Sequence, residues 1–219
     1  MPHDHHDHAP HSHTGMSPSG HPYRADNDEP LTYWQIMEIA MRELMIEKGE
    51  TTAAEIARQI DTMDTRSPSN GAAVVARAWV DPAFKSRLLN NASDASREMG
   101  FDIGALQLIA VENTDEVHNV IVCTLCSCYP RNLLGLPPDW YKSRAYRSRL
   151  VKTPRAVLRE FGLDLPDSTT LRVHDSTADM RYVVLPARPI GTEGMSEAEL
   201  AELVTRDSMI GTGLPRTPR

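Results

Sequence analysis

The sequence predicts an α+β protein, arranged as a layered α-β-β-α domain with an N-terminal helical extension. Helical periodicity dominates residues 31–100, and short strand-like runs lie beyond them, mixed with further helices. Apolar residues make up 40 % of the 219 residues, which suffices for one packed core. We therefore expect one domain with extensions at its ends.

Residues 1–30 are predicted to form a disordered, histidine-rich tail. They hold seven of the nine histidines, together with Pro, Gly, Ser and Asp, and almost nothing that a core would bury. Neutral imidazoles bind Ni, Cu, Co and Zn, so one interpretation is weak metal handling. The other is a solvated tail that binds metal only incidentally.

Residues 31–66 are predicted to form a helical extension that packs on a partner subunit. Thr32 and Gln35 make a capping box at the start of a helix over 31–48. Apolar side chains recur along this helix at spacings of three and four residues: Trp34, Met37, Met41, Leu44 and Met45. A methionine-rich stripe of this kind is typical of a core or of a surface that faces a partner.

A second short helix is expected to start at Thr52, which pairs with Glu55 as a capping box, and to run toward Asp61. The segment 64–70 is expected to be a loop, because it combines Ser, Pro, Asn and Asp. Residues 71–100 then predict two or three further helices.

The catalytic, metal-binding domain is predicted to span residues 67–211, and residues 212–219 to form a flexible tail. Four strands are predicted within the domain, over 106–113, 117–122, 169–175 and 180–186. The arginine-rich segment 134–162 predicts helices, and Ser196 with Glu199 predicts the cap of a last helix.

Charge and hydropathy exclude several classes of protein. The net charge of −7 provides no general basic field for a phosphate backbone, so no nucleic-acid partner is expected. No apolar run approaches the roughly 18 to 20 residues of a membrane helix, and the N-terminus lacks the layout of a secretion signal. We therefore expect a cytoplasmic protein that makes no use of a membrane.

All three cysteines lie within the hexapeptide "CTLCSC" at 123–128. A structural zinc site would need a fourth ligand, for which His118 and His174 are the candidates. A Cys-x-x-Cys redox pair would use the first two thiols and leave Cys128 unexplained. Buried thiols gathered by chance are a third alternative.

A fourth interpretation adds backbone nitrogens to the donor set. The deprotonated amides of Ser127 and Cys128, with the sulfurs of Cys126 and Cys128, offer an equatorial S₂N₂ plane closed by small chelate rings. Cys123 then supplies an axial sulfur, and the sixth position stays open. Such donors hold a low-spin trivalent cobalt or iron ion far better than zinc. A trivalent ion with an open position can polarise a nitrile or activate a water.

This hexapeptide, followed by "YP", resembles the metal-binding claw of the nitrile hydratase α subunit. Thr124 is similar to the cobalt-containing branch of that family, where the iron branch has serine. Further segments resemble the same subunit, at 111–118, 134–143, 146–151, 180–186 and 204–211. The resemblance covers residues 31–211.

The resemblance implies a carbon–nitrogen lyase that hydrates a nitrile to the amide at Co(III), with iron as the less favoured metal. Cys123 would be the axial thiolate, Cys126 a sulfinic acid and Cys128 a sulfenic acid. Ser127 and Cys128 would lend their amide nitrogens. The sulfenate oxygen is then a candidate nucleophile toward the nitrile carbon, with attack by water as the rival mechanism.

Four residues around the claw are implied as well: Thr124, Tyr129, Gln107 and Asp175. The segment after Gln107 is shorter than in the family, and His174 stands where the family often has tryptophan. A third departure is Arg131, in "CYPR", where many cobalt nitrile hydratases have tryptophan.

The resemblance also implies partners. They are a separate β subunit, or split β-like chains, in an α2β2-type heteromer, a metallochaperone or activator protein, and a small-molecule nitrile. Arginines of the β subunit would pair with the oxidised sulfurs. Arg131 and the His/Asp-rich tail are similar to the γ subunit of thiocyanate hydrolase, which is the alternative enzyme. A metal-storage or metal-transfer protein is the alternative of another class.

Overall fold

The computed structural model describes residues 30–218, and the chain divides after Thr65 into two compact units. The histidine-rich tail predicted over residues 1–30 lies outside the described residues, except for Pro30, as does Arg219. Within residues 30–218, no helix is long and apolar enough to cross a membrane.

The first unit contains two helices, α1 (Tyr33–Glu47) and α2 (Ala53–Asp64). Each begins at its predicted capping box, since the Thr32 and Thr52 hydroxyls accept from the amides three residues on. Neither helix contains a buried residue, so the apolar stripe predicted for the first one is exposed.

The second unit holds the remaining elements. Its helices are α3 (Pro68–Val80), α4 (Pro82–Asn90), α5 (Ala92–Glu98), α6 (Arg131–Leu134), α7 (Asp139–Lys142), α8 (Arg144–Leu150), α9 (Pro154–Glu160), α10 (Glu197–Leu203) and α11 (Arg206–Ile210). The loop predicted over 64–70 is shorter than expected, because α3 starts at Pro68. Proline suits this first helical position, whose N–H has no partner within the helix in any case. Helix α11 was not predicted.

Four strands form two parallel pairs. β1 (Gln107–Glu112) pairs with β4 (Met180–Leu185), and β2 (Val117–Val122) pairs with β3 (Thr170–Asp175). β1 and β2 do not pair with each other, although only a short turn joins them, and neither do β3 and β4. The two sheets contact each other through β2 and β4.

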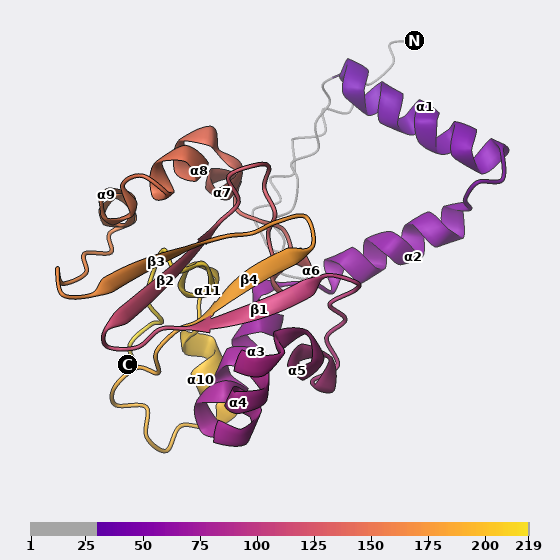
Figure 1. Cartoon of the computed structure of the whole chain (residues 1–219). Helices are drawn as coiled ribbons and strands as arrows, with labels where there is room; N and C mark the ends of the chain where they lie inside the picture. Colours follow the sequence, from indigo (N-terminus) through magenta and orange to yellow (C-terminus); the bar gives the residue numbers. More distant parts are fainter. Residues whose placement is uncertain (1–29, 219) are drawn as a thin grey trace, which may run out of the picture. The chain divides into compact units, whose positions relative to one another are not determined.

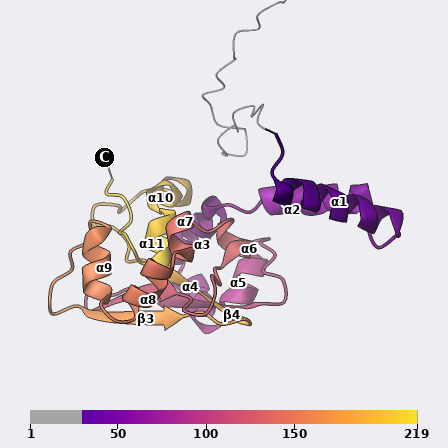
Figure 2. The same ribbon diagram turned by 90° about the horizontal axis from the view of Figure 1, so that it is seen from above.

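Helices pack against the paired strands (Figures 1 and 2). α4 and α5 pack on β1 and α11 on β4, whereas α9 packs on β3. The buried core runs between these layers and includes the centres of β2 and β4. The predicted α+β class, with helices layered on the strands, is confirmed.

A buried polar network lies at the start of β2. His118 Nε2 donates to the Gly211 carbonyl at 2.8 Å, and Asn113 Nδ2 lies 3.2 Å from His118 Nδ1. Asn119 donates through its backbone and side-chain nitrogens to Asn113 Oδ1, at 2.7 and 3.0 Å. His174 Nε2 donates to Asn119 Oδ1 at 2.8 Å. At Gly211 (φ 89°) a Cβ would lie 2.0 Å from the Asn119 carbonyl, so only glycine fits here.

Candidate metal centre

The claw, residues 123–128, begins where strand β2 ends. β2 is rich in β-branched residues and is buried from His118 to Val122, so the chain reaches Cys123 from the interior of the fold. β3 runs parallel to β2, with Val122 opposite Asp175. Because the carboxyl ends of parallel strands lie at the same edge of a sheet, Asp175 lies beside the start of the claw.

The three thiols of the claw lie together. The Cys126 sulfur is 3.5 Å from that of Cys123 and 3.1 Å from that of Cys128, and all three sulfurs lie within 4.8 Å of one another. Cys123 is buried, whereas Cys126 is exposed and Cys128 half-buried. In the part of the chain that the structure describes, this is the one cluster of His, Cys, Asp or Glu suited to a metal.

Backbone nitrogens converge on the same cluster. The Cys126 N–H donates to the Cys123 sulfur at 3.3 Å. The amides of Ser127 and Cys128 donate toward the Cys126 sulfur and lower its pKa. Sulfur atoms and backbone nitrogens, both possible metal ligands, thus lie within one short segment. Ligands of this kind suit a transition metal better than an ion that prefers oxygen, such as magnesium.

The cluster makes its thiols unequal as acids. Hydrogen bonds from Cys128, then from Cys123 and the Ser127 amide, lower the pKa of Cys126 to about 7. Burial, and next the neighbouring Cys126, raise the pKa of Cys128 to about 12, while the charge of Arg181 opposes this rise. Cys126 is therefore the first of these two thiols to become a thiolate, the form that binds metal.

Thr124 is held at both of its polar groups by the carboxylate of Asp175. Its backbone N–H donates to Asp175 Oδ1 at 2.9 Å, and its hydroxyl donates to Asp175 Oδ2 at 2.5 Å. Arg147 Nη1 donates to the Thr124 carbonyl at 3.3 Å. These contacts fix the first turn of the claw to β3 and α8, and the contribution of Arg147 was not predicted.

Tyrosines pack beneath the claw. Tyr141 OH donates to the Cys128 carbonyl at 2.9 Å, and Tyr146 OH donates to the Ile121 carbonyl at 2.7 Å. Tyr129 packs edge-on against Tyr141, with ring centroids 5.1 Å apart. Burial raises the pKa of all three hydroxyls, so they stay neutral. Within residues 30–218 the Tyr129 hydroxyl has no hydrogen-bond partner.

The other candidates from the sequence lie away from the thiols. His118 and His174 belong to the buried network at the start of β2, so neither completes a zinc site with the cysteines. Gln107 is exposed at the start of β1 and lines a small depression shared with Arg131 and Arg181. The structure thus groups Thr124, Tyr129 and Asp175 with the claw, but not Gln107.

An open hollow of about 280 Å³ lies beside the claw, and Cys126, Ser127, Cys128 and Tyr129 form one of its walls. Three cationic residues, Arg131, Lys142 and Arg181, line the remainder together with apolar groups. Arg131 was singled out from the sequence, but Lys142 and Arg181 were not. Arg181 comes from β4, and no local sequence signal reveals that β4 runs past the claw.

Comparison with known proteins gives a consistent result. Residues 32–213 match the family model described as "Nitrile hydratase, alpha chain". The cobalt-containing nitrile hydratase subunit alpha of Pseudonocardia thermophila is 52 % identical over 177 residues, which cover 78 % of this chain and 86 % of that protein. The thiocyanate hydrolase subunit gamma of Thiobacillus thioparus is 43 % identical over 202 residues, covering 86 % and 82 %.

Comparison with solved structures points to the same family. A double mutant of an Fe-type nitrile hydratase from Comamonas testosteroni Ni1 superimposes with a TM-score of 0.79 at 46 % identity, covering 85 % of this chain and 94 % of that one. The fold is therefore shared with this neighbour over nearly its whole length. With a family match over residues 32–213 and identities near one half, the chain belongs to the nitrile hydratase alpha chain family.

Proposed function

We propose that this chain is the metal-binding catalytic subunit of a cobalt nitrile hydratase, a lyase that converts a nitrile into the amide. The observation that carries the proposal is the convergence of three thiols and two backbone amides beside an open hollow. Thr124 in the claw and a cobalt-containing relative at 52 % identity favour cobalt over iron.

In this proposal Cys123, Cys126 and Cys128, with the amide nitrogens of Ser127 and Cys128, hold Co(III). When bound, a trivalent ion supplies Lewis acidity that polarises a nitrile or activates a water. Cys126 would be present as a sulfinic acid and Cys128 as a sulfenic acid, the early products of thiolate oxidation. The two residues differ in exposure, and the greater exposure of Cys126 supports its assignment to the higher oxidation state.

The chain's own residues would position and orient these groups. Asp175 holds Thr124, and through it the first turn of the claw, in a fixed geometry. Tyr141 holds the Cys128 carbonyl and so would fix the backbone that carries the sulfenate oxygen of Cys128. That oxygen is the candidate nucleophile toward the nitrile carbon, and a water in the hollow is its rival.

A partner subunit is part of the proposal. Helix α1 exposes a run of large apolar side chains, each at least 41 % exposed: Tyr33, Trp34, Ile36, Met37, Met41, Leu44 and Met45. Such a surface favours burial against another chain. We assign it to a β subunit, or to split β-like chains, in an α2β2-type cytoplasmic heteromer that an activator protein loads with cobalt.

The test is co-expression of the chain with a nitrile hydratase β subunit and an activator, followed by turnover of a small nitrile such as acetonitrile. We expect amide as product, bound cobalt, visible sulfur-to-metal charge-transfer absorption, and a claw peptide heavier by three oxygens. Zinc with unmodified thiols in the active complex would refute the proposal. If deletion of residues 1–21 abolished metal loading and no nitrile were hydrated, a metal-transfer role would replace it.

A second candidate is thiocyanate hydrolase, which one observation favours. Arg131 lines the hollow beside the claw, and a positive charge there suits an anionic substrate. The thiocyanate hydrolase subunit gamma matches 86 % of this chain. Assay of the same complex with thiocyanate separates the two enzymes, because the nitrile hydratase proposal expects the faster turnover with nitriles.

A further inference from the structure

The hollow beside the claw carries an excess of positive charge. Arg131, Lys142 and Arg181 line it, and no aspartate or glutamate among the described residues does. This contrasts with the chain as a whole, whose net charge is −7. Charges of one sign that line a hollow raise the local concentration of ligands of the opposite sign.

The three cations differ in how far they are already engaged. Arg181 Nη1 donates to the Thr177, Ala178 and Met180 carbonyls. Lys142 lies 4.0 Å from the fully exposed carboxylate of Asp139.

Arg131 is different, because its guanidinium forms no hydrogen bond or ion pair with any residue among 30–218. Its backbone, by contrast, is bonded: the N–H donates to the Tyr129 carbonyl at 2.7 Å and the carbonyl accepts from Gly135. The backbone of Arg131 is therefore fixed, while its guanidinium lines the hollow without a hydrogen-bonding or ion-pair partner in the described part of the chain.

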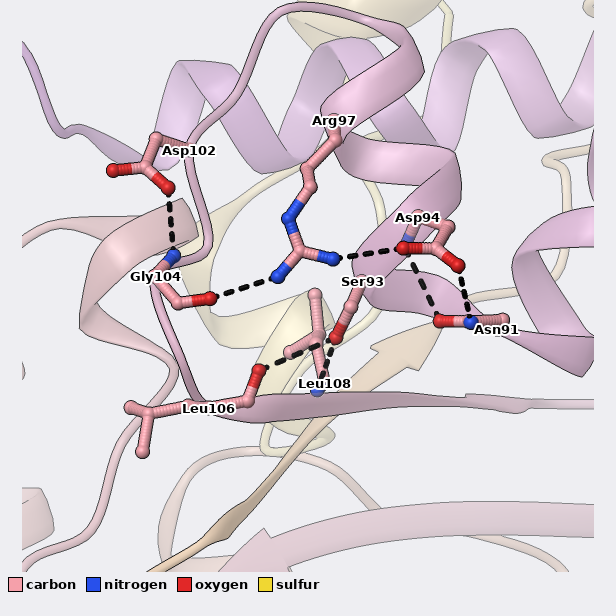
Figure 3. Close-up of polar contacts among 8 residues, drawn as sticks. All are labelled: Asn91, Ser93, Asp94, Arg97, Asp102, Gly104, Leu106 and Leu108. Atoms are coloured by element: carbon pink, nitrogen blue, oxygen red, sulfur yellow. Dashed lines mark hydrogen bonds and ion pairs between the residues drawn. The ribbon is translucent and has the colours of Figure 1, made fainter.

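The backbone that carries Arg131 is held firmly. The next residue, Asn132, donates from Nδ2 to the Ile103 carbonyl at 2.6 Å. Figure 3 shows how the loop around Ile103 is tied down: Arg97 bridges Asp94 and the Gly104 carbonyl, at 2.8 and 2.7 Å. A guanidinium on a fixed helix start loses less conformational entropy on binding an anion than one on a mobile loop.

The negative charge of a metal-loaded claw distinguishes the roles of Arg181 and Arg131. A claw of three thiolates and two deprotonated amides carries more negative charge than a trivalent ion neutralises. Arg181, which lines the hollow together with Cys128, offsets part of this excess. The charge of Arg131 then remains available to a group that enters the hollow.

We propose that Arg131 determines specificity by binding a carboxylate on the substrate, so that the preferred substrate is a nitrile that carries a carboxylate. This inference rests on the proposed nitrile hydratase function. A hollow of about 280 Å³ exceeds several-fold the volume of a three-atom anion such as thiocyanate, and Leu136 and Pro137 offer an apolar wall for the carbon chain between nitrile and carboxylate. Arginine binds a carboxylate through two parallel hydrogen bonds, which a neutral analogue cannot form in the same way.

The test uses two nitriles of nearly equal shape, 3-cyanopropanoate and the neutral 3-cyanopropanamide, with the cobalt-loaded complex. We expect kcat/KM to favour the carboxylate, and Arg131→Gln to lower the ratio of the two kcat/KM values by about tenfold, equivalent to about 1.4 kcal/mol. Arg131→Lys should retain part of the preference. Arg144→Gln is the matched control, since Arg144 lines a separate hollow with Thr124 and Leu125 and should leave the ratio unchanged.

A binding readout accompanies the kinetics. Titration of the charge-transfer absorption with each nitrile gives the two dissociation constants. Added salt should weaken binding of the carboxylate and leave that of the amide unchanged, because screening acts only on charged pairs.

Failure of the specificity inference can be distinguished from failure of the nitrile hydratase function. An unchanged ratio in Arg131→Gln, with both nitriles still hydrated, overturns the specificity inference and leaves the nitrile hydratase function standing. Faster turnover of thiocyanate than of either nitrile overturns both and favours the second candidate. Loss of the charge-transfer absorption in Arg131→Gln would instead place Arg131 in the metal centre, which also contradicts the inference.

Discussion

Strand β2 has a polar cluster at each end, and the two clusters differ in whether their polar groups are bonded to one another or face solvent. At its start, Asn113, His118 and Asn119 are almost fully buried, and each hydrogen-bonds within a closed network. At its end, Cys126 and Cys128 contact mainly one another and face a hollow. The closed cluster can only stabilise the fold, whereas the open one keeps ligand atoms available for chemistry.

The largest expected effect falls on the open cluster. Cys128→Ser replaces a thiol that can ionise and be oxidised with a hydroxyl that can form neither a thiolate nor a sulfenate, so we expect activity of the complex to fall by more than about a thousandfold. Cobalt content and charge-transfer absorption should fall with it. The unfolding free energy of the metal-free chain should change by less than about 1 kcal/mol, because the side chain is half-buried and nearly isosteric.

The second prediction concerns a substitution in the closed cluster. Asn119→Leu leaves His174 Nε2 without its partner and removes the side-chain donor to Asn113 Oδ1, which keeps only the backbone N–H of residue 119. We expect a loss of roughly 3 kcal/mol in unfolding free energy, measured by urea denaturation. Asn90→Leu, at an exposed position in α4, should cost less than about 0.5 kcal/mol. An equal loss in both variants would show that the network adds no stability of its own.

An intermediate effect is expected where the open cluster is fastened to β3. Asp175→Asn retains one acceptor oxygen but cannot accept from both the amide and the hydroxyl of Thr124. We expect about a tenfold lower kcat with little change in KM, because the claw would be less well positioned for the reaction.

Two controls accompany this variant. Thr124→Ser keeps both hydrogen bonds and should retain activity, and Asp167→Asn, on an exposed loop, should have no effect. If Asp175→Asn and Thr124→Ser lost activity equally, the two hydrogen bonds would not be what positions the claw.

The smallest effect concerns pH. Burial lowers the pKa of both His118 and His174 below the ordinary value of 6.5, with the charge of Arg172 a second cause at His174. The unfolded chain therefore binds protons more readily, and stability should decline as pH falls below about 6.5, by at most about 1.4 kcal/mol per pH unit for each histidine. His174→Gln should show a shallower decline between pH 7 and pH 5.5. Identical slopes in the two proteins would contradict this assignment.

Local features of the structure were predictable from the sequence. Capping boxes at Thr32 and Thr52 mark helix starts, since they depend on residues three positions apart. The claw is equally local, because its sulfurs and amides lie within six residues, and chelation by neighbours needs no tertiary information.

Non-local features could not be predicted. Nothing in the strand sequences indicates that β1 pairs with β4 rather than with β2, because each strand is short and apolar. That pairing decides which side chains reach the claw. It brings Arg181 to the hollow and leaves Gln107 outside.

The parallel pairing of β2 with β3 also determines when the thiols can be ordered during synthesis. Thr124 and Asp175 lie 51 positions apart, so the first turn of the claw cannot be fixed until β3 has been made and has docked. A nascent chain that ends before β3 presents loose thiols, which bind whichever divalent metal is most available, zinc and copper above cobalt. Under the proposed function, selective loading with cobalt is therefore a task for the finished chain, and a cell that supplies cobalt after folding would avoid this competition.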